Sequence, residues 1–307
     1  MTAPQRSLDT PNKCPQCGAS LELTAQQMDC PNCHAYLIID SRHIAVRVTQ
    51  FDSLAAGLHP FDLPDPKAGM PVLRMQVPAG WGWTGGTRWT SNPVQAARVH
   101  FAIRDDQGIT ALEGMPSDYF GWTNDQNMQN RIPRGGNYYG TEFQPPATAM
   151  EALQHFILPR YRPIPGLQVI GREPVDALIQ EISCNLKARG ETSMVDAFCV
   201  HMCYMLDQVI LFEQIEGVVL TSRRLSAGEH GTVESVNWCT SNVYACRARP
   251  EQFEQWCPVF RQMIDSIQIN PLWYAYNQQT VQRLSQQAQL QVRQVNDKKP
   301  FRDTQSV

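Results

Sequence analysis

Apolar and polar positions alternate along several stretches of the chain, and this alternation predicts β-strands. The three strongest runs cover 194–206, 208–222 and 233–247, and they are dense in valine, isoleucine, cysteine and tyrosine. β-Branched and aromatic residues favour extended backbone, and short polar breaks such as 226–231 are typical of hairpin turns. The three runs therefore predict an antiparallel meander.

Other stretches show the spacing of an amphipathic helix. Apolar residues recur every three or four positions in 147–159, 175–188 and 250–269, which is the period of one helical face. Pro250 suits the first turn of the last helix, whereas Pro258 inside it predicts a kink or a split. With shorter strands predicted at 73–81, 98–104 and 109–113, the pattern indicates an α+β domain with helices packed on one antiparallel sheet.

Two Cys-x-x-Cys pairs near the N-terminus predict a metal site. They are Cys14 with Cys17 and Cys30 with Cys33. Paired turns of this kind present four thiolates to one point, which is the tetrahedral set that Zn²⁺ prefers in structural sites. Two disulfides, or four unconnected thiols, are the alternative. Because a segment of about 30 residues cannot bury enough apolar surface to fold alone, zinc ligation would supply its folding free energy.

These two pairs resemble the zinc-ribbon family over residues 10–40 or so. The first pair has proline after its leading cysteine and glycine after its second, as the family usually has, whereas His34 follows the second pair and could compete as a ligand. The resemblance implies a small β zinc ribbon at 10–50. Zinc ribbons bind nucleic acid in some proteins and protein partners in others, or serve only as folded appendages.

Charge helps to choose between these roles. Residues 1–50 carry four basic and four acidic residues, and the whole chain has a net charge of −3 with a pI near 6.2. Surfaces that follow phosphates normally show clustered lysine and arginine. A protein partner is therefore favoured, and DNA or RNA contacted through the ribbon is the alternative.

Composition and breaks suggest the remaining organisation. Residues 36–40 and 43–48 are predicted strands, 51–71 is a proline-rich linker, 72–273 is the second domain, and 274–307 is a polar, glutamine-rich helix with a disordered end. No signal-peptide pattern or membrane span occurs, so we expect a cytoplasmic protein. Six further cysteines lie in apolar patterns, which indicates buried thiols.

A second resemblance covers residues 72–273. The sequence VPAGW ending at Trp81, the segment YACR at 244–247, Phe253, Asp265 and Ser266, and NPLW at 270–273 together resemble the Mog/PsbP-like family. The resemblance implies an α/β/α sandwich. Members of that superfamily serve mainly as binding or assembly modules and share no common active site.

Within the second domain, the strongest candidate for a metal or catalytic site is the set Cys199, His201 and Cys203. Strand alternation places these three on one face. Neighbours two residues apart lie about 6.5–7 Å from each other and could share a metal or act as base and nucleophile, but the two cysteines are about 13 Å apart. An enzyme using His201 and a neighbouring thiol is therefore the weaker functional alternative, and we assign no catalytic residue.

Residues 116–144 are predicted to form a long loop that carries aromatic side chains. Aromatic residues on loops often form protein-binding surfaces, so we expect partner contact here; alternatively the rings fold back to cover the sheet. The candidate partner-binding residues are Tyr119, Trp122, Tyr138 and Tyr139. The sequence thus predicts a zinc-binding intracellular protein that acts as an interaction or assembly module without catalysis.

Overall fold

The computed structural model describes residue 20, the short segments 27–29, 36–39 and 45–47, and residues 57–228 and 231–297. The chain divides into two compact units, 1–59 and 60–307, and each is described by itself below.

The described part of the first unit is a three-stranded antiparallel sheet. Its strands are β1 (Gln27–Asp29), β2 (Tyr36–Ile39) and β3 (Ala45–Arg47), in the order β1-β2-β3. The strands predicted at 36–40 and 43–48 are therefore confirmed within one to two residues at each end. Asp29 pairs with Tyr36 at one end of the β1–β2 ladder.

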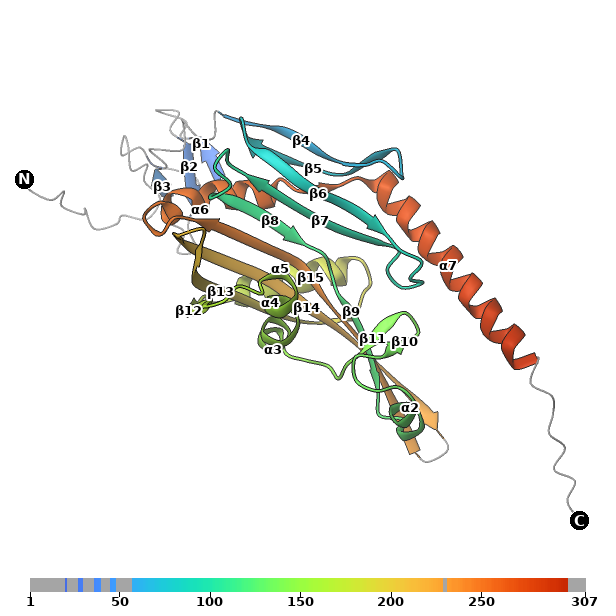
Figure 1. The fold of residues 1–307 in the computed structure, drawn as a ribbon. Helices are drawn as coiled ribbons and strands as arrows, with labels where there is room; N and C mark the ends of the chain where they lie inside the picture. The colour runs from blue at the N-terminus through green and yellow to red at the C-terminus, as the bar shows by residue number, and fades with distance from the viewer. Residues whose placement is uncertain are drawn as a thin grey trace, which may run out of the picture. The chain divides into compact units, whose positions relative to one another are not determined.

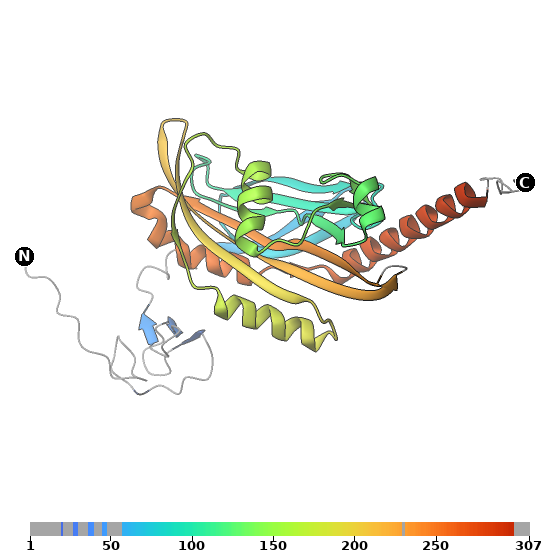
Figure 2. The ribbon, with the colours of Figure 1, turned by 90° about the horizontal axis from the view of Figure 1, so that it is seen from below.

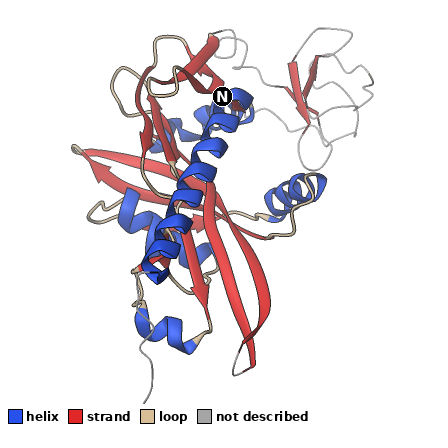
Figure 3. Ribbon diagram, turned by 90° about the vertical axis from the view of Figure 1, so that its right-hand side faces the viewer, coloured by secondary structure: helices blue, strands red, loops and turns tan. Residues whose placement is uncertain are grey.

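A long antiparallel meander forms the centre of the second unit, as its sequence predicts. Its strands are β13 (Met194–Leu206), β14 (Val209–Gly228) and β15 (Gly231–Ala248). Asp207 and Gln208 both have positive φ, as a two-residue hairpin turn between right-twisted strands requires. Beyond Thr221, β14 pairs with β15 alone, and Figure 3 shows these two strands extending together as a ribbon.

The strand β15 has two different neighbours along its outer edge. Residues Val243–Arg247 pair with one strand, and Ser235–Cys239 pair with the next strand along the chain. We call this division of the sheet, at residues 116–118, the fork (Figure 1). One arm continues through β8 (Ala111–Met115), β7 (Ala97–Arg104) and β6 (Gly82–Trp89), and the other through β9 (Tyr119–Thr123), β11 (Thr141–Phe143) and β10 (Asn137–Tyr138).

One face of the sheet is covered by the helix predicted at 147–159. It consists of α3 (Ala149–Ala152), a π-helical turn η1 (Leu153–Ile157) and α4 (Leu158–Tyr161), and it lies across the sheet in Figure 2. The helix starts at a capping box between Thr148 and Glu151. Its apolar side buries Leu153 and Ile157 against the core, where Phe120 stacks on Trp238 at 4.0 Å between ring centroids.

The opposite face holds the other predicted helices and a second, smaller sheet. In the helix predicted at 250–269, Phe253, Phe260 and Met263 form the buried apolar side. Pro258 does not split this helix, because the backbone carbonyl that loses its N–H donor to the proline lies in an exposed turn. These elements are α5 (Asp176–Ala188), α6 (Pro250–Asp265), β4 (Leu58–Asp65), β5 (Met70–Pro78), β16 (Gln268–Ile269) and α7 (Pro271–Asp297), while β12 (Gln168–Arg172) forms an edge of the main sheet.

Two sequence predictions about connecting segments were wrong. Part of the expected linker, 58–65, is strand β4 at the edge of the small sheet, where Pro60 and Pro64 need no N–H for a ladder. The expected loop at 116–144 contains β9, β10, β11 and a short helix, α2 (Gln126–Arg131). The strand β9 pairs with β15, which is distant in sequence, and β11 and β10 are added to β9 in turn, so local spacing did not reveal them.

Among the described helices, none is both long enough and apolar enough to cross a membrane.

Candidate functional site

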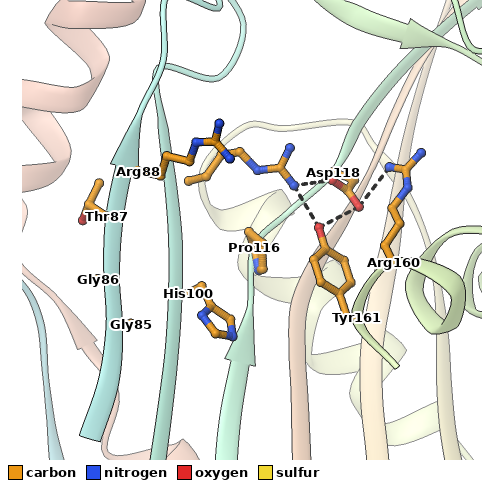
Figure 4. A pocket seen from close by; sticks show the side chains of 10 residues that line it. Gly85, Gly86, Thr87, Arg88, His100, Pro116, Asp118, Arg160 and Tyr161 are labelled. Atoms are coloured by element: carbon orange, nitrogen blue, oxygen red, sulfur yellow. Dashed lines mark hydrogen bonds and ion pairs between the residues drawn. The ribbon is translucent and has the colours of Figure 1, made fainter. Parts of the chain in front are cut away.

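The fork places three polar side chains from two different segments around one buried carboxylate. Asp118, only 3% exposed, lies 2.6 Å from Nη2 of Arg98 on β7 and 3.2 Å from Nη1 of Arg160 on α4. The hydroxyl of Tyr161 donates to the same carboxylate over 3.0 Å and accepts from Arg98 over 2.8 Å. Figure 4 shows Arg160 and Tyr161 converging on Asp118.

Backbone hydrogen bonds fix Asp118 at this point. Its N–H donates to Oγ1 of the buried Thr240, and its carbonyl accepts from the Thr240 N–H, each over 3.0 Å. Pro116 has no N–H to continue the ladder of β8, so the chain leaves one arm and enters the other here. The carboxylate is therefore held by the strand break itself rather than by a flexible loop.

A pocket of about 680 Å³ opens beside this cluster. Its walls include Arg88 and His100, which project from β6 and β7 on the same side, whereas Thr87 points away (Figure 4). Gly86 lies opposite His100 in the ladder, and a Cβ at that position would meet nothing within 4 Å. The missing side chain leaves space over the paired strands.

Electrostatics differ between the groups that line the pocket. Burial lowers the pKa of His100, with a smaller upward effect from Glu113, so the imidazole is neutral at pH 7. Burial and then the Asp118 charge raise the pKa of Tyr161 to about 12, so its hydroxyl stays protonated and can donate. The pocket therefore combines guanidinium charges with neutral polar groups.

A second hollow, of about 290 Å³, lies on the other side of the Arg98–Asp118–Arg160 contacts. Arg160 bonds Glu142 of β11 there, with Nη2 2.5 Å from Oε2, and its guanidinium lies over the rings of Phe120 and Phe156 at 5.4 and 5.3 Å. Arg160 is thus held by two carboxylates and two aromatic faces, which fixes its position.

A separate ionic network is buried between the arm that begins with β8 and the meander. Arg162 bridges Glu113 at 2.8 Å and Glu213 at 2.7 Å, and Arg247 contacts Glu113 at 3.3 Å. Glu213 is fully buried and also accepts a hydrogen bond from the Tyr204 hydroxyl. Burial alone would raise the pKa of Glu113, but Arg162 and Arg247 outweigh it and hold that pKa below its usual value. This network is closed, because each of these charges faces an opposite one.

The four aromatic residues expected to contact a partner have different surroundings. Trp122 packs against the hydrophobic core, and the ring of Tyr138 covers Gly121, where an added Cβ would lie 2.5 Å from the ring. Tyr119 is 38% exposed, and desolvation raises the pKa of its hydroxyl to about 12. Tyr139 is 69% exposed. Of the four, Tyr139 presents most surface to a partner.

A further hollow of about 600 Å³ lies next to Tyr139. Its walls come from the β6–β7 connection, the β10–β11 turn and helix α7, and they carry no charged side chain: Pro93, Val94, Asn137, Tyr139, Gly140, Ser285, Ala288 and Gln289.

Cys199, His201 and Cys203 lie on one face of β13, as their spacing predicts, with Phe198, Val200 and Met202 in the core on the other face. His201 Nε2 approaches Glu173 Oε1 to 3.0 Å without forming a hydrogen bond. Burial raises the pKa of the Cys199 thiol to about 12, and its sulfur accepts a hydrogen bond from Gln214. A protonated thiol is a poor nucleophile, so Cys199 is not activated for catalysis.

The predicted zinc ligands Cys14, Cys17, Cys30 and Cys33 lie outside the described residues. Within the ranges that the structure describes, no group of three or more potential metal ligands occurs.

Sequence reasoning missed the fork cluster entirely. Its residues come from positions 98, 118 and 160–161, which only the sheet topology brings together. A local signal existed in the run Arg160-Tyr161-Arg162 at the end of a predicted apolar helix, because three consecutive polar residues there must find partners or water.

Comparisons with known proteins give little additional guidance. No family model matches the sequence, and no curated protein matches it. One similar solved structure is that of cyanobacterial PsbP (CyanoP) from Synechocystis sp. PCC 6803, with 12% identity over 70% of this chain and 94% of that chain. Its TM-score is 0.22, which is too low to carry an argument about fold or function.

Proposed function

We propose that this protein is a zinc-binding interaction or assembly module of the cytoplasm that acts without catalysis. The observation that carries the proposal is Tyr139, a large aromatic side chain that is 69% exposed on a tightly held turn beside an uncharged hollow.

The turn that carries Tyr139 is fixed by hydrogen bonds on both sides. The Gly140 N–H donates to the Asn137 side chain, and the Gly140 carbonyl accepts from Asn92 over 2.5 Å. Tyr139 itself adopts a φ of 51°, a left-handed conformation that non-glycine residues rarely occupy. Because the backbone of this turn is already held, ordering it costs little when the ring binds a partner, which favours affinity.

The chemistry of the neighbouring hollow indicates its occupant. Pro93, Val94 and Ala288 supply apolar walls, and the polar groups around them are neutral amides and a hydroxyl. Such a lining suits an apolar or aromatic side chain on a protein segment, with the amides available to its backbone. We therefore expect a protein partner.

The first unit would hold Zn²⁺ through Cys14, Cys17, Cys30 and Cys33. The ion would be structural, because four thiolates leave no open coordination position for catalysis.

Two other features support parts of the proposal. The six described cysteines are free thiols, which suits the reducing cytoplasm. The α+β arrangement of the second unit, with helices on both faces of an antiparallel sheet, is compatible with a Mog/PsbP-like domain, and we propose that assignment from the motifs at 77–81, 244–247 and 270–273.

The test is affinity purification of the tagged protein from cells that express it, with and without nuclease. We expect a protein partner that survives nuclease, is lost with Tyr139→Ala and is retained with Tyr274→Ala, which removes another exposed tyrosine. Loss of all bound protein after nuclease treatment would instead favour the nucleic-acid alternative.

A further inference from the structure

We propose that the fork pocket binds a small organic oxyanion, a carboxylate or a phosphate, through Arg88, Arg98 and Arg160. This site is separate from the Tyr139 surface, and the inference does not depend on the proposed partner.

The fork pocket carries an excess of positive charge. Its lining contains three arginines and one carboxylate, Asp118, which leaves an excess of two positive charges. The excess is still one positive charge when Glu142, which pairs with Arg160 from the neighbouring hollow, is included. In a protein whose net charge is −3, a local positive excess in a concave site attracts anions selectively.

Two of the three binding groups, Arg98 and Arg160, are held in place before a ligand arrives. Asp118 fixes Arg98 and Arg160 from one side, and Arg160 is also held by Glu142 and by aromatic contacts. Nη2 is the one nitrogen of the Arg98 guanidinium with a hydrogen-bond partner among the described residues. The remaining N–H groups of Arg98 can therefore bond an oxyanion without losing the contact to Asp118.

Arg88 is exposed on the same side of the strands as His100 (Figure 4). Its guanidinium has no ion-pair or hydrogen-bond partner in the described part of the chain. A structural ion pair with Asp118 would need no third arginine. An oxyanion between Arg88 and Arg98 would give Arg88 a partner and would balance the positive excess.

The fork pocket is large enough for a small organic molecule. A volume of about 680 Å³ falls within the usual range for ligand pockets. Gly86 leaves the floor open next to His100, and a side chain there would project into the space above the two strands. The His100 imidazole and the Tyr161 hydroxyl provide neutral polar groups for the rest of the ligand.

Isothermal titration calorimetry on the full chain tests the site. The probes are inorganic phosphate, succinate and, as a neutral match, succinamide. We expect saturable binding of phosphate or of succinate and no binding of succinamide. Which of the two anions binds tells whether the ligand carries a phosphate or a carboxylate. Arg88→Gln should weaken that binding by about tenfold or more, because it removes a charged hydrogen-bond donor.

Arg224→Gln is the matched control, since it removes an exposed arginine on β14 and changes the net charge equally. Arg88 is exposed, so its replacement should leave the fold intact, which the melting temperature checks. Absence of saturable binding by both anions, equal binding of succinamide, or equal weakening by Arg224→Gln and Arg88→Gln would overturn the proposal.

Discussion

The hydroxyl of Tyr161 donates a hydrogen bond over 3.0 Å to the buried carboxylate of Asp118. This contact joins the end of the α4 helix to the point where the sheet divides, and Thr240 of β15 fixes the same aspartate from below. The carboxylate therefore joins helix α4 to β7, whereas β15 is bonded to the Asp118 backbone. Replacing the Asp118 side chain should loosen α4 and β7 and leave the backbone bonds to Thr240 in place.

Asp118→Ala is expected to lower the free energy of unfolding by about 2–3 kcal/mol. Removing the carboxylate leaves two guanidiniums and a hydroxyl without their shared partner, although partial exposure of the arginines reduces the cost. Urea unfolding measures the effect. Asp106→Ala, at an exposed turn, is the control and should change little; equal stabilities of the two variants would contradict this role for Asp118.

Stability should fall in acid partly through Glu113. Because Arg162 and Arg247 hold its folded-state pKa below the usual 4.5, its contribution is fully present above that value and is lost as pH falls through the lower folded-state pKa. Glu113→Gln should flatten the acid side of a plot of unfolding free energy against pH. The exposed Glu251→Gln should leave the slope unchanged. An unaltered slope in the Glu113 variant would show that the network does not titrate as described.

Trp122 and Tyr139 should respond in opposite ways to truncation. Trp122→Ala removes part of the core cover and should cost about 2 kcal/mol, less than for a fully buried tryptophan. Tyr139→Ala should change the unfolding free energy by less than about 0.5 kcal/mol, because the ring is mostly exposed. Thermal and urea unfolding compare the two. An early-melting Tyr139 variant would mean that the ring is structural.

Protein prepared without chelator should carry about one zinc per chain, measured by metal analysis. Cys17→Ser should lose the metal and unfold residues 10–40, while the transition of the unit formed by 60–307 stays unchanged, because that unit has its own core. Cys184→Ser, at an exposed free thiol, is the control. Substantially less than one equivalent of zinc in the wild-type protein would refute the site.

The elements that sequence predicted well are those whose pairing is local. The meander follows from three apolar runs with turns between them, and Gly108, which has a positive φ, lies between the strands predicted at 98–104 and 109–113. The fork could not be foreseen, because Pro116 and Asp118 become a strand break only when both flanking strands pair with the distant β15. Tyr139 was foreseen as an aromatic candidate, but its difference from Trp122 depends on which ring the core covers.

Site-specific photocrosslinking tests the proposed interaction surface most directly. A photoreactive phenylalanine analogue replaces Tyr139, and the same analogue at Tyr274 on α7 is the control for an exposed ring elsewhere. The account predicts that residue 139 crosslinks to a specific protein in nuclease-treated extracts, and that residue 274 gives none of this product. Crosslinking of that protein through residue 274 but not through residue 139 would contradict it.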